Sequence, residues 1–286
     1  SGTNVTPAQF ARECQRVAPI PRQTVRTVDS RVNDELTTRA VGNATRQTTS
    51  ARIEEVATRS LPPVKVYNND TVDTILKRYE KAIGGRDVFA SLTSRVSKGR
   101  LDVLGKSYGG RVEFYGKAPN KSLTVMNAEP FGLFKRGFDG RTGWNVSASL
   151  GLQNLAGAEL AALAVEADFY REIRLRELYP QIRLVGLVTE NYHEVYKIEA
   201  TPRSGVPEYL YFDVQTSLLT RRDVIRQTSQ GTALAEFYFG DWRVVDGVKI
   251  PFKTTELLPN AKYVFTIEEV KHNVPVDETL FRPPNR

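Results

Sequence analysis

Cysteine and histidine, which build most redox and metal sites, are scarce in this chain. Its 286 residues include one cysteine, Cys14, and two histidines, His193 and His272. One cysteine excludes an internal disulfide, and Cys14 lacks both the apolar context of a lipidated cysteine and the C-x-x-C-H of a haem site. No H-x-x-x-H or comparable ligand spacing is present. We therefore expect no metal and no other cofactor, and a free thiol at Cys14, with an intermolecular disulfide as the minority alternative.

Catalytic motifs are also missing. There is no G-x-S-x-G turn for a nucleophilic serine. Gly105-Lys106-Ser107 resembles the end of a phosphate-binding loop, but the glycine required five positions earlier is Arg100, and a strand follows instead of a helix. We interpret that segment as a hairpin turn. Glu268 and Glu269 are adjacent on a strand and point to opposite faces, so they cannot form an acid–base couple. The sequence therefore predicts no enzyme and no catalytic residues.

Long apolar runs are absent as well. The longest apolar patch, residues 155–167, is too short to cross a bilayer and contains Glu159 and Glu166. The net charge of +7 is spread along the chain, which favours at most a weak attraction to anionic surfaces. We expect no transmembrane segment and no nucleic acid partner, whereas contact with a membrane surface is compatible with the charge. The chain begins at Ser1, and no signal peptide is visible. This start is expected of a mature exported chain, and also of a chain that was shortened for another reason.

Aromatic residues are missing between Phe10 and Tyr67. A segment this poor in core residues cannot bury enough apolar surface to offset its own ordering entropy. Leu61-Pro62-Pro63 then interrupts the chain. We therefore predict an extended arm or linker at residues 1–63 and a folded domain at residues 64–286. The arm is expected to contact either that domain or other protein subunits.

What the chain does have is period-two alternation, clearest between residues 236 and 284. Asp246-Gly247 is a strong hairpin signal, because a type I′ turn needs two residues with positive φ. Apolar and polar residues alternate on both sides of it, and Pro259-Asn260 predicts the next turn. Three long antiparallel strands therefore lie in a row. Pro275, Pro283 and Pro284 predict that the tail leaves the sheet.

The rest of the domain follows the same pattern. A helix is predicted from residue 72, capped by Asn69-Asp70 and ended by Gly84-Gly85, and a second short helix at residues 86–92. Five strands are expected between residues 95 and 147, one or two helices at residues 152–178, and six strands after them. The fold class is α+β, mostly antiparallel β.

The segment from Asp246 to Pro284 also resembles a known family. Its hairpin D-G-V-K-I-P-F, followed by F-T-I-E-E-V-K-H-N-V-P-V-D-E-T-L-F-R-P-P, is similar to the end of LolA/LolB-like bacterial lipoprotein-sorting proteins. Residues 74–96 resemble the opening of a related module of acidobacterial proteins, some of which carry a reaction-centre-type cytochrome c segment. The resemblance implies a strongly curved incomplete β-barrel of about 10–11 strands, with helices on its concave face and an apolar cavity for acyl chains.

Under this resemblance, a set of large apolar residues would line the cavity. The predicted ligand-binding residues are Leu101, Phe114, Val125, Phe134, Trp144, Leu160, Leu163 and Phe169. The alternative is that they form an ordinary filled core. Arg171, Arg174 and Arg176 would suit an anionic headgroup, and the alternative for them is a solvated helix face.

The resemblance and the missing motifs together favour non-catalytic binding of a lipid or lipoprotein acyl chain in the periplasm or elsewhere in the bacterial cell envelope. A second possibility, from another class, is a structural subunit of an extracytoplasmic assembly held by residues 1–63. An enzyme is the third.

Overall fold

A computed structural model describes residues 70–129, 132–228 and 231–284. The predicted arm, residues 1–63, and Cys14 lie outside these residues. The described part contains one antiparallel sheet of thirteen strands. The strands are β1 (Ser94–Val103), β2 (Gly109–Lys117), β3 (Lys121–Glu129), β4 (Gly132–Phe138), β5 (Gly143–Ser147), β6 (Gly151–Asn154), β7 (Gln181–Glu190), β8 (His193–Thr201), β9 (Glu208–Asp213), β10 (Leu219–Thr228), β11 (Gly231–Val245), β12 (Val248–Leu258) and β13 (Ala261–His272).

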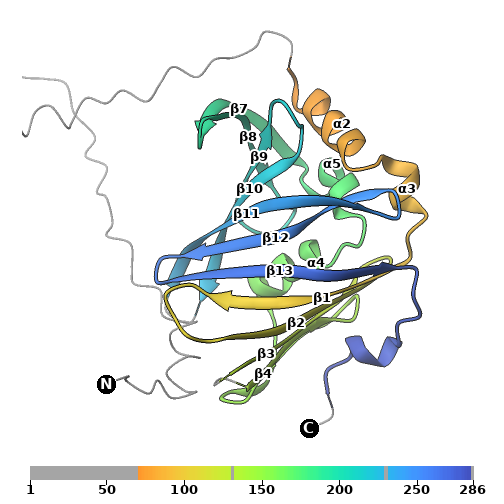
Figure 1. The fold of residues 1–286 in the computed structure, drawn as a ribbon, viewed down its shortest axis with the longest axis vertical. Helices are drawn as coiled ribbons and strands as arrows, with labels where there is room; N and C mark the ends of the chain where they lie inside the picture. The colour runs from red at the N-terminus through yellow and green to blue at the C-terminus, as the bar shows by residue number, and fades with distance from the viewer. Residues whose placement is uncertain (1–69, 130–131, 229–230, 285–286) are drawn as a thin grey trace, which may run out of the picture. The chain divides into compact units, whose positions relative to one another are not determined.

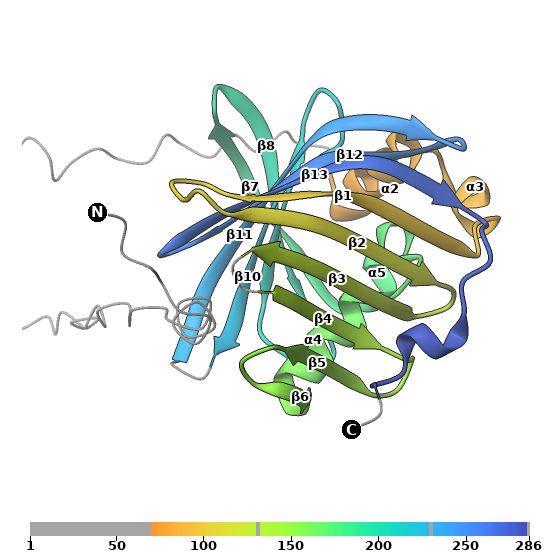
Figure 2. The ribbon, with the colours of Figure 1, turned by 60° about the horizontal axis from the view of Figure 1, so that its bottom comes forward.

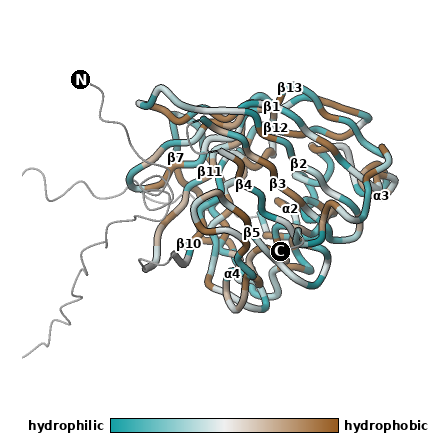
Figure 3. Tube along the Cα trace, turned by 90° about the horizontal axis from the view of Figure 1, so that it is seen from below, coloured by the Kyte–Doolittle hydropathy of each residue, from teal (hydrophilic) through white to brown (hydrophobic). Residues whose placement is uncertain are grey.

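The sheet consists of two meanders joined side by side. Strands β1–β6 follow one another on one side, and β7–β13 on the other, in the order β6-β5-β4-β3-β2-β1-β13-β12-β11-β10-β9-β8-β7. The pairing of β1 with β13 joins them, with a register shift between Lys98 and Gly99. The sheet is strongly curved (Figures 1 and 2). Apolar and polar segments interleave along the strands, as the alternation in the sequence predicts (Figure 3).

The turns lie where their residues predict them. Asp246 and Gly247 have φ values of 49° and 82°, the two positive angles of the predicted hairpin turn between β11 and β12. Pro259 and Asn260 connect β12 to β13. Residues 104–108, which include Gly105-Lys106-Ser107, connect β1 to β2, as expected of a turn and not of a phosphate loop.

Short helices lie on one side of the curved sheet, which we call its inner face (Figure 2). They are α2 (Val72–Ala82), α3 (Arg86–Ala90), α4 (Gly157–Glu166), the 3-10 turn η2 (Arg171–Ile173) and α5 (Leu175–Leu178). The cap of α2 is Thr71, whose hydroxyl accepts from the Thr74 amide, and not the predicted Asn69-Asp70. Gly84, at φ 123°, ends α2 as predicted. Within the described residues, no helix is long and apolar enough to cross a membrane.

Two predictions of strand content were wrong. The sheet of the described residues has thirteen strands, not ten or eleven. Residues 152–154 were expected to start a helix, but they belong to β6, which pairs with β5. The error has a local cause, because a segment of four residues is too short for its periodicity to separate strand from helix.

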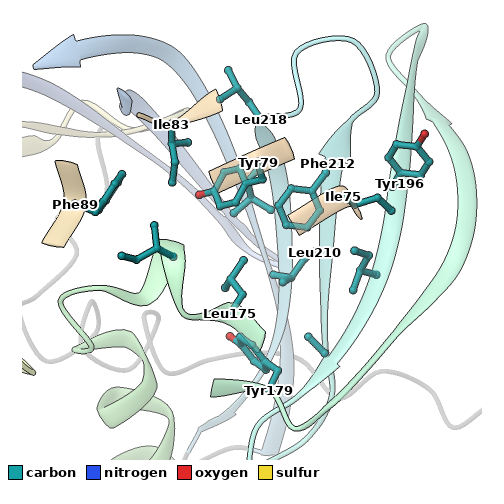
Figure 4. Close-up of a cluster of buried hydrophobic side chains, with 14 of the residues drawn as sticks. Ile75, Tyr79, Ile83, Phe89, Leu175, Tyr179, Tyr196, Leu210, Phe212 and Leu218 are labelled. Atoms are coloured by element: carbon teal, nitrogen blue, oxygen red, sulfur yellow. The ribbon is translucent and has the colours of Figure 1, made fainter. Parts of the chain in front are cut away.

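The main core lies between α2, α3, α5 and the strands β7–β12. Its centre includes Tyr79 and Phe212, whose rings meet edge to face with centroids 5.1 Å apart. Ile198 and Leu210 are fully buried in the same cluster. Figure 4 shows Leu210 near Phe212. Gly84 lets α2 approach the hairpin, since a Cβ there would lie 2.4 Å from the carbonyl oxygen of Gly247. This half of the inner face is filled by apolar side chains.

A second apolar cluster covers the opposite, outer face of β1–β5. The chain after β13 crosses that face and ends in the 3-10 turn η3 (Glu278–Phe281), visible in Figure 2. Phe281 is fully buried against Leu123 and Trp144, and the Trp144 indole donates to the Phe281 carbonyl at 2.9 Å. The predicted departure of the tail from the sheet is confirmed. Its consequence is that β1–β5 are covered on both faces.

Candidate ligand cavity on the inner face

The structure divides the predicted cavity residues between the two faces. Leu101, Phe114 and Phe134 lie on the inner face, by the registers of β1–β2 and β3–β4. Leu160, Leu163 and Phe169 approach that face from the helical segment.

Val125 and Trp144, in contrast, belong to the outer cluster with Phe281, so their assignment to the inner face was wrong. Alternation shows that Val125 shares a face with Leu123, and Trp144 with Val146, but it does not show which face of the sheet the helices cover. The role of the other six as ligand contacts stays a prediction.

Two glycines allow the helical segment to approach the sheet closely. A Cβ on Gly143 of β5 would lie 2.9 Å from the Cδ1 atom of Leu160, too close for a real contact. A Cβ on Gly116 of β2 would lie 3.3 Å from the ring of Phe169. Glycine at both positions leaves room for α4 and Phe169 to pack closely against the inner face.

A small cavity lies between the sheet and the segment after α4. Its volume is about 160 Å³. Phe114 and Phe169 form apolar walls, Ser97 and Ser122 add hydroxyl groups, and Arg95 is placed over the Phe169 ring at 5.7 Å. The backbone amide of Phe169 donates to the Pro119 carbonyl at 3.0 Å, which fixes this wall to the β2–β3 connection.

Charged side chains fill the space next to this cavity. Arg222 of β10 donates from Nε to Glu208 at 2.8 Å and lies 3.8 Å from Glu166 at the end of α4. Tyr179 donates its hydroxyl proton to Glu208 at 2.9 Å. These contacts connect the helical segment to β9 and β10 through buried ion pairs, where breaking a pair is costly.

Electrostatics keep the buried carboxylates charged. Burial alone would raise the pKa of Glu166, but Arg222 and other nearby guanidinium groups lower it to about 2. The other contributors are Arg136, Arg226 and Arg171. Burial likewise opposes ionisation of Glu208, and Arg222 overcomes it, so that the pKa of Glu208 is lowered. The region is therefore rich in arginine, with ionised carboxylates between the guanidinium groups.

Three arginines of the helical segment were predicted to suit an anionic headgroup. Arg171 is the one that lines the cavity. Arg174 pairs instead with Asp168 at 2.6 Å, and Arg176 pairs with Asp73 at 3.3 Å on the exposed surface. The solvated-face alternative therefore describes Arg176.

Sequence reasoning missed the arginines that come from strands, namely Arg95, Arg136, Arg222 and Arg226. A signal for two of them was present, because Arg222 and Arg226 share the parity of the buried, inner-face Val224.

A larger hollow, of about 1000 Å³, lies at the β1–β2 hairpin. Its lining combines charged side chains, including Arg100, Asp102 and Arg111, with apolar ones such as Leu104 and Val264. Beyond Gly99 these positions alternate with Leu101 and Val103, so they belong to the outer face. We take the inner cavity as the candidate site, because it has aromatic walls and is covered by the segment that follows α4.

The two histidines take up different environments. His272 is buried, with its Nδ1 atom 3.0 Å from Asp246 and its Nε2 atom accepting from Arg95 at 3.0 Å. His193 is exposed, 3.6 Å from Asp213. Within the described residues, no group of three or more His, Cys, Asp or Glu side chains is placed to hold a metal ion.

Comparison with known proteins gives the class of fold. No family model matches the chain, and no curated protein matches its sequence. A DUF1329 family protein from Desulfovibrio piger is 15% identical, with a TM-score of 0.52 over 74% of this chain and 98% of that one. A LolA superfamily protein from Nitrosomonas europaea is 14% identical, with a TM-score of 0.49 over 75% and 98%. An outer membrane lipoprotein-sorting protein domain from Vibrio parahaemolyticus is 11% identical, with a TM-score of 0.48 over 72% and 94%.

The first of these likenesses is close enough to show a shared fold. The described residues share the fold of this DUF1329 family protein and form one large open curved sheet. At 15% identity the likeness concerns the fold alone. The ligand has to be argued from the residues of the inner cavity.

Proposed function

We propose that this protein binds a lipid or a lipoprotein acyl chain without catalysis, in the periplasm or elsewhere in the bacterial cell envelope. The observation that carries the proposal is the inner cavity, which lies between the curved sheet and the segment that follows α4 and has Phe114 and Phe169 as its apolar walls. Apolar walls with a few convergent polar groups are the usual composition of a ligand site. The fold and the resemblance to lipoprotein-sorting proteins support the envelope location.

Helix α4 has the properties of a lid. It lacks a side-chain cap at its N-terminus, and its packing on the sheet rests on a small cluster around Leu163, Ala167 and Phe138. Elements with few buried apolar contacts open at the lowest free energy. A cavity of about 160 Å³ is also smaller than the roughly 300–1,000 Å³ of a pocket that encloses a whole small molecule. We therefore propose that the sheet acts as an incomplete barrel and that α4 moves outward when an acyl chain enters.

A fluorescent long-chain fatty acid tests this function. We expect the full chain to bind the probe saturably and to enhance its emission, because the probe enters an apolar site. Phe114→Ala should weaken binding roughly tenfold, since the apolar contact of the aromatic ring with the probe contributes about 1–2 kcal/mol to the binding free energy. The matched control is Val125→Ala, on the neighbouring strand but on the outer face. The proposal is wrong if the wild-type protein does not bind the probe, or if both variants change binding equally.

The alternative function, a structural subunit held by residues 1–63, stays a prediction from composition. Under this alternative, a chain starting at Val64 should have the melting temperature of the full chain but should no longer associate with a partner. Thermal melting and light scattering after size exclusion measure both quantities. If removal of residues 1–63 unfolds the rest, these residues are part of the core, and the predicted boundary between arm and domain is wrong.

A further inference from the structure

Two guanidinium groups of the inner cavity have buried nitrogen atoms without acceptors. Arg95 reaches the cavity from β1, and Arg171 reaches it from η2. The Nε atom of Arg95 donates to His272, but its buried Nη2 atom has no hydrogen-bond partner, and the buried Nε atom of Arg171 has none either. A buried donor without an acceptor costs about 1–3 kcal/mol, and more when charged, so folded proteins satisfy such groups with a ligand or ordered water.

The carboxylates that line the cavity do not supply the missing acceptors. Asp168 accepts from Arg174 at 2.6 Å, and Glu166 pairs with Arg222. Glu172 lines the cavity and, like Glu208, attracts Arg171, but neither carboxylate accepts a hydrogen bond from the buried Nε atom of Arg171.

A third guanidinium group without a full set of acceptors lies on β4. Arg136 of β4 also has a buried Nε atom without an acceptor, and it contributes to the positive potential at Glu166. The site therefore has unused cationic donors and is prepared for a negative charge.

We propose that the inner cavity binds the anionic headgroup, a carboxylate or a phosphate, of an acyl lipid, with Arg95 and Arg171 as its ligands. This inference rests on the proposed function and narrows it to anionic amphiphiles. The planar guanidinium fork matches both headgroups through paired, charge-assisted hydrogen bonds. Ser97 and Ser122 line the cavity from the sheet, and their hydroxyl groups add donors.

The dimensions of the cavity decide which part of the lipid it holds. About 160 Å³ accommodates a headgroup with its first carbon atoms, between Phe114 and Phe169, but not a whole lipid. The rest of the acyl chain then follows the inner face under α4, toward Leu163. The headgroup is thus bound at the inner end of the site and the chain is directed toward the lid.

Binding of three probes to the full chain at pH 7.5 tests this inference. They are a long-chain fatty acid, the fatty alcohol of the same length and inorganic phosphate, each measured by displacement of the fluorescent probe and by calorimetry. We expect the acid to bind at least tenfold more tightly than the alcohol, because a charged hydrogen-bonded group contributes about 1.5–3 kcal/mol. Arg171→Gln and Arg95→Gln should each remove most of that preference, because they should weaken binding of the acid much more than binding of the alcohol.

The control variant is Arg176→Gln, five residues beyond Arg171 but exposed and paired with Asp73. It should keep the preference for the acid, and thermal melting of all variants checks that they are folded. Equal affinity of acid and alcohol in the wild type would overturn the inference while leaving the acyl carrier intact. Binding of neither lipid would refute the proposed function itself. Tight binding of phosphate with no binding of the acid would show a site for a free anion and overturn the assignment to a lipid.

Discussion

The two halves of the inner face are packed in different ways. Against β7–β12, helices α2, α3 and α5 bury a continuous set of large apolar side chains, with Tyr79, Phe212 and Leu210 at its centre. Against β1–β5, helix α4 contributes a small cluster around Leu163, and the neighbouring segment packs through arginine–carboxylate pairs and a cavity. Since apolar burial supplies most folding free energy, we expect the first half to act as the scaffold and the second half to open at a lower free energy.

The difference between the two halves suggests how one sheet can provide both a stable core and a route by which a ligand enters the inner cavity. Buried ion pairs contribute little net stability compared with apolar packing of the same volume. They do fix the geometry of the partners, and Arg222 holds Glu166 and Glu208 in this manner. A lid that is positioned by charges and weakly held by apolar contacts is suited to repeated opening.

A matched pair of leucine substitutions should give the largest effect and tests this contrast directly. Leu210→Ala, in the scaffold half, should lower the free energy of unfolding by about 4 kcal/mol, because the surrounding core cannot collapse into the space. Leu163→Ala, under α4, should cost about 2 kcal/mol, since few neighbours lose contacts and the helix can shift.

Urea unfolding followed by tryptophan fluorescence measures both values. Leu210 is fully buried and Leu163 is 4% exposed, so burial alone predicts nearly equal costs. Equal losses would remove the distinction between scaffold and lid.

The outer face offers the next test, because β1–β5 are stabilised there by the tail instead of by a helix. Phe281→Ala should lower the free energy of unfolding by about 3 kcal/mol. It should also shift the emission of Trp144 to longer wavelength, since the indole is 2% exposed and contacts Phe281. Lipid binding should change little, because the tail covers the face opposite the cavity. Loss of binding with the fold intact would contradict this separation of the two faces.

The smallest effect concerns the junction of the two halves, where His272 of β13 contacts Arg95 of β1. Burial, together with the charge of Arg95, lowers the pKa of His272 below its usual value near 6.5, although Asp246 opposes the shift. The unfolded chain therefore binds a proton first as the pH falls. The contribution to stability is complete above about pH 6.5 and is lost as the pH falls toward the lower pKa of the folded state.

The melting temperature between pH 7.5 and pH 5.5 measures this contribution. His272→Gln should weaken the decrease on acidification. His193→Gln is the matched control, because the side chain of His193 is 65% exposed, and it should leave the pH dependence as in the wild type. An unchanged slope in His272→Gln would show that other groups cause the acid sensitivity.

The positions of most strands along the chain, and of their turns, could be predicted from the sequence, because alternation and turn residues are local signals. Asp246-Gly247 fixes the hairpin whatever surrounds it, and β5 has the bounds that were expected. The faces of β3 and β5 could not be predicted, since the tail that covers Trp144 comes from 137 residues further along the chain. The same holds for the cavity, where Arg95, Arg171 and Arg222 meet only after the two meanders have paired.

The most direct test of the account is to identify what the cavity holds. The full chain would be purified without detergent from a bacterial envelope fraction, extracted with chloroform and methanol, and the extract analysed by mass spectrometry. We predict an acyl lipid with a carboxylate or phosphate group, in an amount close to one per protein and strongly reduced in Arg171→Gln compared with Arg176→Gln. An extract without acyl lipid, or one with equal amounts of lipid in both variants, would contradict the account.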